Sequence, residues 1–174
     1  MNKNAFIGLL AIVLVFGMSV VGCDNGSTSS TNGENDTWSN VTNFSQVNGT
    51  WKAPSSYSVS NQGITVNVTT TNYLITFNST AKTISVSGSM TSRYSGANIS
   101  TLWPDLKEGI GYMNEMEGVT ASANDTNHSI TITYNNYSEV ITDEIFSSMD
   151  FQINQNGSKL IIIEGGIENI YTKQ

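Results

Sequence analysis

The sequence of 174 residues is poor in several residue types, and each shortage excludes a class of protein. It has a single cysteine, so no disulfide can form within the chain. Its seven basic residues are scattered and too few to form the phosphate-neutralising stripe of a nucleic-acid-binding protein. Charged residues of both signs make up only 12% of the chain.

Ser, Thr and Asn replace the missing charge, and together they supply 64 of the 174 residues. With 38% hydrophobic residues, the chain does not have the composition of a disordered protein. It has two prolines and many threonines. A polar but uncharged sequence of this kind is typical of antiparallel sheet with one face in water.

The N-terminus carries a targeting segment that must be set aside before the fold is considered. Lys3 precedes an apolar run over residues 5–22, and polar sequence follows immediately after Cys23. The end of the run, Val20-Val21-Gly22-Cys23, resembles the lipobox of bacterial lipoprotein signal peptides. A run of this length could instead span a bilayer as an uncleaved anchor.

The lipobox resemblance implies that cleavage removes residues 1–22 and that the Cys23 thiol carries a diacylglycerol thioether. Several acyl chains on one residue attach a protein durably to a bilayer. Without Lys3, six basic residues face 14 acidic ones, which gives a net charge of −8. The acyl group, not the protein surface, would therefore hold the chain on an anionic membrane. We expect a cell-envelope location, at the outer membrane or cell surface in preference to the inner membrane.

The remainder of the chain divides into a tether and one domain. Residues 23–47 contain the lipidated N-terminus and a Ser/Thr/Asn/Gly-rich stretch without periodicity, which predicts a flexible tether whose second half can dock on the domain through Trp38 and Phe44. Residues 48–174 show period-two alternation of apolar and polar residues, which predicts strands. These strands are expected at 64–68, 73–77, 84–90, 130–134, 149–153, 160–163 and 167–172.

Short turn-forming segments join the expected strands. They are Asn61-Gln62-Gly63, 78–81, Asn135-Asn136 and 155–158. About eight to ten strands joined in this way predict an all-β fold, either a small antiparallel meander barrel or a two-sheet β-sandwich. The barrel is attractive because closure removes exposed strand edges.

One segment, residues 100–118, departs from the strand pattern. Ser100 or Thr101 is predicted to cap a short helix that has Pro104 in its first turn and ends at Gly109. The aromatic and Met residues of this insertion are Trp103, Tyr112, Met113 and Met116. They would either form a lid that lines an apolar pocket or plug one end of the barrel as additional core.

The Gly49-Thr50-Trp51 segment resembles the Gly-x-Trp that begins the first strand of lipocalins and related small barrels. The junction Gly22-Cys23-Asp24-Asn25-Gly26 is similar to that of small lipocalin-like lipoproteins of spirochaete type. The resemblance implies that Gly49 and Trp51 are structural and that Trp51 plugs the barrel. Lipocalins usually pack a C-terminal Arg across this Trp, whereas here Lys173 is the cation nearest the last strand.

The sequence offers little for catalysis. The only histidine, His128, lies in a polar turn, and no Gly-x-Ser-x-Gly motif accompanies it. The carboxylate pairs Glu115/Glu117 and Asp143/Glu144 lack metal-ligand spacing and are interpreted as solvated surface groups. No phosphate-binding, dinucleotide or haem motif occurs. We therefore expect no enzyme activity, no cofactor, no metal and no nucleic-acid partner.

Two functions remain open. In the first, the protein is a monomeric, membrane-anchored lipoprotein whose barrel binds a small apolar ligand under the 100–118 insertion. In the second, it is a surface or envelope interaction protein with a filled barrel and no small-molecule ligand. In both, Cys23 attaches the chain to the lipid bilayer.

Overall fold

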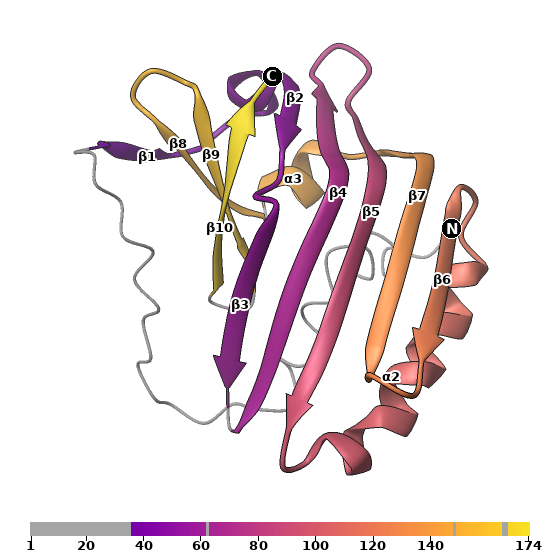
Figure 1. Ribbon diagram of the computed structural model, residues 1–174. Helices are drawn as coiled ribbons and strands as arrows, with labels where there is room; N and C mark the ends of the chain where they lie inside the picture. Colours follow the sequence, from indigo (N-terminus) through magenta and orange to yellow (C-terminus); the bar gives the residue numbers. More distant parts are fainter. Residues whose placement is uncertain (1–35, 62, 148, 165–166) are drawn as a thin grey trace.

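The computed structural model of the chain describes residues 36–61, 63–147, 149–164 and 167–174. Cys23 and the expected signal peptide lie outside these residues. The elements, in chain order, are β1 (Trp38–Asn40), η1 (Phe44–Val47), β2 (Gly49–Lys52), β3 (Ser56–Asn61), β4 (Ile64–Asn78), β5 (Thr83–Gly96), α2 (Ile99–Asn114), β6 (Val119–Asn124), β7 (Ser129–Val140), α3 (Asp143–Ser147), β8 (Asp150–Asn154), β9 (Lys159–Glu164) and β10 (Ile167–Lys173). The predicted all-β fold with a helical insertion is confirmed (Figure 1).

The ten strands form one antiparallel sheet in the order β1-β8-β9-β10-β2-β4-β5-β7-β6, and β3 pairs beside β4. Because β1 and β6 stand at the two ends of this order, the sheet is open and the predicted closed barrel is wrong. The two-sheet alternative does not form either, since all ten strands share one hydrogen-bonded sheet. Figure 1 shows β4, β5, β7 and β6 side by side, with β8, β9 and β10 at an angle to them.

The free edge of β6 has a hydrogen-bond partner without closure of the sheet. The side chain of Asn114, the last residue of α2, accepts from the Ala121 N–H at 2.6 Å and donates to the Ala121 carbonyl at 3.0 Å. The Val119 N–H donates to the Met116 carbonyl at 3.2 Å. The insertion thus satisfies the Val119 N–H and both backbone groups of Ala121 at this edge, which hinders its pairing with another chain.

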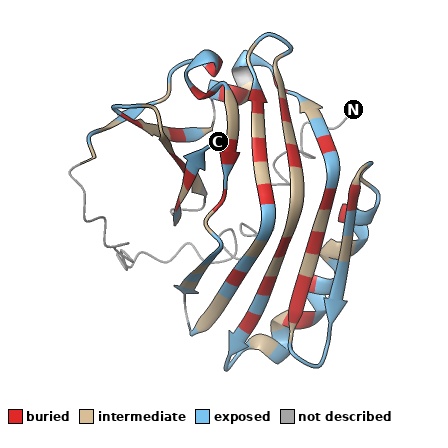
Figure 2. Cartoon of the chain, turned by 45° about the horizontal axis from the view of Figure 1, so that its top comes forward, coloured by how far each residue is buried: buried red, intermediate tan, exposed pale blue. Residues whose placement is uncertain are grey.

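Alternation determines which side chains are buried. Burial switches residue by residue along β4, β5 and β7, so one face of the sheet is apolar and the other is polar (Figure 2). On the polar face, hydroxyl groups of neighbouring strands pair directly. Their oxygens are 2.9 Å apart in Thr50–Thr76, 3.0 Å in Ser85–Ser138 and 2.9 Å in Thr91–Thr131. Such cross-strand pairs stabilise a sheet modestly while they keep its outer face uncharged.

Three of the four predicted turns lie between paired strands, but Asn135-Asn136 does not. The chain passes through these two residues inside β7, where the pairing with β5 shifts between Val86 and Gly88. Asn136 adopts a φ of 57°, the left-handed conformation that its short polar side chain tolerates. The same property that favours Asn in turns therefore serves a bulge here.

The helix in the insertion is longer than predicted. It begins after Asn98 instead of Ser100 or Thr101, and it continues past Gly109 to Asn114. Pro104 lies beyond the first turn, where its ring removes the N–H that would bond the Ser100 carbonyl. Both residues are exposed, so water can satisfy that carbonyl.

Burial of one helix face explains this extension. Trp103, Leu106 and Met113 are each no more than 6% exposed. Tertiary packing of these three side chains outweighs the weak helix propensity of Gly109.

The packed body begins before residue 48. Strand β1 pairs with β8, and Phe44 and Val47 are buried in the core. Asp36 Oδ2 accepts from Lys159 Nζ at 2.8 Å, and Asp36 Oδ1 accepts from Asn154 Nδ2 at 3.3 Å. Residues 36–47 thus belong to the body instead of the tether, because their apolar side chains and backbone groups find partners there.

Candidate functional site

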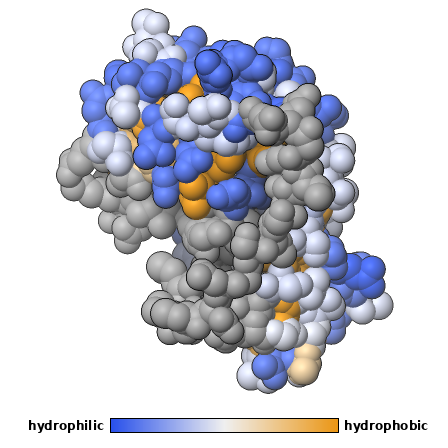
Figure 3. Space-filling view, turned by 90° about the vertical axis from the view of Figure 1, so that its left-hand side faces the viewer, coloured by the Kyte–Doolittle hydropathy of each residue, from blue (hydrophilic) through white to orange (hydrophobic). Residues whose placement is uncertain are grey.

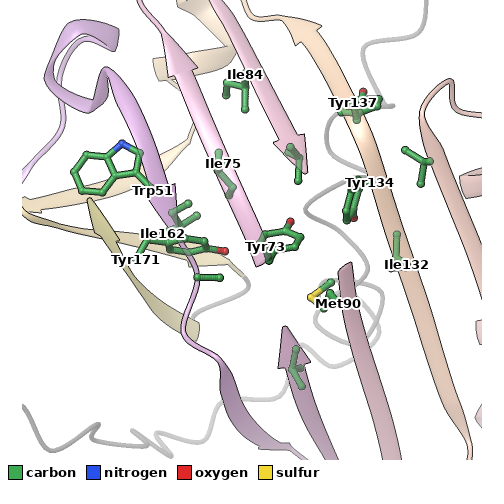
Figure 4. Packing of buried hydrophobic residues seen from close by; sticks show 14 of the residues in the cluster. Trp51, Tyr73, Ile75, Ile84, Met90, Ile132, Tyr134, Tyr137, Ile162 and Tyr171 are labelled. Atoms are coloured by element: carbon green, nitrogen blue, oxygen red, sulfur yellow. The ribbon is translucent and has the colours of Figure 1, made fainter. Parts of the chain in front are cut away.

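The inner face of the open sheet, along the long strands, is apolar. Its middle consists of Val68 and Tyr73 on β4, Met90 on β5, and Ile132 and Tyr134 on β7. All five are buried in the chain of 174 residues. Met90 and Ile132 are directly paired, and the rings of Tyr73 and Tyr134 meet edge to face at 5.6 Å. Figure 4 shows the side chains of Tyr73, Met90, Ile132 and Tyr134 projecting from three neighbouring strands toward the same side.

Described elements cover the two ends of this face. At one end, Trp103 of α2 lies against Tyr94 of β5, with 6.1 Å between the ring centroids. At the other end, Phe44 of η1 meets Phe77 of β4 at 5.9 Å and Phe146 of α3 at 4.8 Å. The middle of the face lies between these aromatic contacts along the strands. We call the five residues of the middle, Val68, Tyr73, Met90, Ile132 and Tyr134, the apolar face.

The surroundings of this face oppose negative charge. Burial raises the pKa of the nearby Tyr94 hydroxyl to about 12, because a phenolate would lose its hydration there; a hydrogen bond with Ser92 acts in the opposite direction. The pKa of Tyr137 is also raised, first by burial and then by Glu139, whose Oε2 accepts from the Tyr137 hydroxyl at 2.8 Å.

A small cavity lies where α2 meets the sheet. Its volume is about 30 Å³, and it is lined by Tyr94, Asp105, Leu106, Gly109, Ile110, Met113, Ala121 and Ile130. A space of this size holds about one water molecule and no larger ligand. Packing beneath α2 is therefore close, as in an ordinary protein core.

The four residues predicted to form a lid or a plug separate in the structure. Trp103 and Met113 lie on the buried face of α2, and Met116 is partly buried and packs against the core. Tyr112 is 67% exposed and does not line the cavity. Trp103 and Met113 thus act as core at one end of the apolar face, and the predicted pocket role of Tyr112 is not supported by its position.

A polar contact holds α2 to the β6–β7 hairpin. Asp125 Oδ1 accepts from Trp103 Nε1 at 2.6 Å and from Lys107 Nζ at 2.9 Å. The hydrogen bond from Lys107 is the main reason that the pKa of Asp125 lies below its usual value, and the bond from Trp103 is the second. The His128 ring packs edge to face on Trp103 at 5.1 Å. The only histidine thus contributes to packing at a hairpin.

Gly49 and Trp51 occupy structural positions, but Trp51 does not plug a barrel as predicted, because the described sheet is open. Gly49 adopts a φ of 118° at the start of β2, and Trp51 is completely buried. Trp51 Nε1 donates to the Val47 carbonyl at 2.7 Å. The Lys173 ammonium lies 5.2 Å from the centre of the Trp51 ring, within the range of a cation–π contact.

Other candidate groups lie at the surface of the described chain. Glu115, Glu117 and Asp143 are exposed, and Asp143 forms an ion pair with Lys82 at 2.7 Å. Within residues 36–174, as far as they are described, no cluster of His, Cys, Asp and Glu has the geometry to hold a metal ion. No helix of the described chain is both long enough and apolar enough to cross a bilayer.

No sequence motif marks the apolar face. Alternation predicts its residues only as inward-facing positions of separate strands and does not reveal which of these positions become neighbours. The strand register reveals these neighbours, because it brings Val68, Met90 and Ile132 into adjacent rows of β4, β5 and β7.

Comparison of the chain with family models, with curated proteins and with solved structures finds no match.

Proposed function

We propose that this protein is a bacterial lipoprotein, anchored through acylated Cys23, whose sheet domain binds an apolar molecule against its apolar face. The observation that carries the proposal is the arrangement of Val68, Met90 and Ile132 on one face of the sheet, beside two tyrosines whose rings meet edge to face. Apolar side chains with a few polar hydroxyl groups are typical of small-molecule sites.

The proposal concerns the mature chain. Described helices contact the sheet at its two ends, through Trp103 and Phe44. An apolar ligand would lie between these contacts. Contact with an apolar surface favours a molecule with an alkyl chain or fused rings.

The anchor and the start of the body limit how far the site can lie from the membrane. Lys159 and Asn154 hold Asp36, so residues 24–35 connect the acylated cysteine to the body. Twelve residues span at most about 40 Å when fully extended. The site would therefore be close enough to the bilayer to take its ligand from it.

The test is analysis of what purifies with the protein. The full chain would be expressed with its signal peptide, purified from membranes and examined by native mass spectrometry and solvent extraction. We expect a bound apolar molecule in addition to the covalent acyl chains. Protein that carries no such mass would contradict ligand binding.

Two substitutions in β5 provide matched variants for this test. Met90→Trp fills the apolar face, while Ser89→Trp places the same side chain on the opposite face of the same strand. The bound mass should be lost only from Met90→Trp. Loss from both variants or from neither would place the ligand elsewhere. Circular dichroism checks that both variants fold.

The outer face supports the second candidate, an envelope interaction protein. In register across four strands, Thr69, Thr91, Thr131 and Ser122 form one row of hydroxyl groups, and Thr71, Ser89, Thr133 and Thr120 form the next. The side of the molecule that carries β1, β8 and β9 is mainly hydrophilic at its upper end (Figure 3). If the outer face with its hydroxyl rows is the functional surface, Thr91→Asp should abolish binding to cell-envelope material and leave ligand content unchanged.

A further inference from the structure

We propose that the outer edge of β3 pairs with the same edge of a second copy of this chain, so that two sheets join through antiparallel strands at the membrane. This inference goes beyond ligand binding, and only its membrane setting rests on the proposed acyl anchor. It follows from the backbone groups that β3 turns away from β4.

Strand β3 has a described neighbour on one side only. It pairs with the first half of β4, whereas β2 pairs with the second half of β4 and continues the sheet to β10 (Figure 1). The strand order places no described strand on the other side of β3. Ser56, Ser58 and Ser60 are exposed there. One edge of β3 therefore faces solvent in the described part of the chain.

The pairing with β4 determines which backbone groups lie at this edge. The Thr70 N–H donates to the Ser55 carbonyl at 2.9 Å, and this pair continues the register of β3 and β4. Backbone groups point to alternate sides along a strand. Odd-numbered residues of β3 therefore bond to β4, and the N–H and carbonyl groups of Ser56, Ser58 and Ser60 point outward.

Neither charge nor a bulge protects the β3 edge. Edge strands commonly carry charged side chains, prolines or bulges that prevent pairing with another chain. All six residues of β3 pair with β4 without a register shift, and residues 53–81 include no Asp, Glu, Lys or Arg. The mature chain as a whole would carry a charge of −8. Two copies repel each other least where they meet through an uncharged segment, so a second copy fits this edge.

One register of self-pairing uses all three serines. An antiparallel pair with its twofold axis at Ser58 places Ser58 opposite its own copy and Ser56 opposite Ser60 of the second copy. Each such pair can exchange two backbone hydrogen bonds. The half-buried Tyr57 and Val59 then lie opposite each other across the axis, and aromatic and β-branched residues are favourable cross-strand neighbours.

The anchor would strengthen this pairing. A single short strand makes a small interface, and small interfaces are transient in solution. Acylation at Cys23 would confine all copies to one membrane surface and raise their effective concentration. We therefore expect the isolated body to be mainly monomeric and the anchored chain to be paired.

The experiment is thiol crosslinking of the full chain, expressed with its signal peptide, in isolated membranes. Ser58→Cys places two thiols opposite each other, with their Cα atoms about 5.5 Å apart. Ser60→Cys is the matched control, because its two thiols would lie about 13 Å apart along the strands. With a short bifunctional maleimide we expect at least fivefold more dimer from Ser58→Cys. Co-expression of Ser56→Cys with Ser60→Cys should also give dimer, since these residues face each other.

Each outcome decides a stated claim. Equal dimer from Ser58→Cys and Ser60→Cys would indicate random collision and overturn the pairing, as would no dimer from Ser58→Cys. Crosslinking to a different protein instead would overturn the second copy as the partner. Dimer from the wild type, whose only cysteine is Cys23, would count against acylation, and the ratio of the two variants would still test the pairing.

A proline tests the backbone hydrogen bonds directly. Ser60→Pro in the Ser58→Cys chain removes an outward N–H and leaves the donors that face β4 in place. The amount of dimer should fall at least fivefold. An unchanged amount would overturn hydrogen-bonded pairing of the two β3 edges.

Discussion

Gly88 is the position at which the sheet should tolerate substitution least. It adopts a φ of 93°, and a Cβ added there would lie 2.1 Å from the Asn72 carbonyl oxygen. That oxygen belongs to the backbone of the β4 bulge between Thr71 and Leu74, so it cannot rotate away as a side chain would. Gly88→Ala therefore combines an unfavourable backbone conformation with a steric clash.

The magnitude follows from these two contributions. A non-glycine residue in a left-handed conformation costs about 1–2 kcal/mol, and overpacking against fixed atoms costs about 1–3 kcal/mol. We expect Gly88→Ala to lower the free energy of unfolding by about 3 kcal/mol. For a body of this size the melting temperature should fall by roughly 10 °C.

Two further glycines separate the contributions. Gly157 has a φ of 68° with nothing within 4 Å of an added Cβ, so Gly157→Ala should cost only the conformational part, about 1–2 kcal/mol. Gly111 lies in α2 with equally open surroundings, so Gly111→Ala should stabilise by about 0.5–1 kcal/mol. Urea unfolding followed by circular dichroism measures all three. Equal losses for Gly88→Ala and Gly157→Ala would refute the close approach of β4 and β5 at the bulge.

Three further predictions concern the β6 edge, the α2 contact and the anchor. Asn114→Ala removes both hydrogen bonds to Ala121, so it should cost about 1 kcal/mol and cause concentration-dependent association in light scattering; a variant that remains monomeric would contradict the edge-protecting role. Asp125 has a lowered pKa, so its contribution to stability is present above the unfolded pKa and is lost as the pH falls through the folded value. Asp125→Asn should therefore melt below wild type at pH 7, and the difference should shrink in acid; a constant difference would contradict this. Cys23→Ala should abolish incorporation of radiolabelled palmitate, and continued labelling would show that the cysteine is not the acylated residue.

Local features of the fold were predictable where local chemistry determines them. Apolar alternation in β5 and β7 identifies strands because the side-chain period of two is a property of each strand alone. The Asn156-Gly157 turn between β8 and β9 was predictable for the same reason, since Gly157 adopts the left-handed conformation that the turn requires.

Features that depend on tertiary contacts were not predictable. Whether the sheet closes depends on the partner of the β6 edge, and the side chain of Asn114 takes that place from another element. The helix continues through Gly109 because Met113, beyond it, is buried against the sheet. The apolar face likewise arises only when register brings three strands together, and no short motif in the sequence marks it.

The most direct test of ligand binding at the apolar face uses decanol that carries a photoreactive diazirine. After irradiation of the protein of residues 24–174 and digestion, mass spectrometry locates the labelled peptides. The account predicts labels on the peptides that contain Tyr73, Met90 and Tyr134, and loss of these labels when unlabelled decanol is in excess. Labels confined to exposed residues such as Tyr112, or labels that excess decanol does not displace, would contradict it.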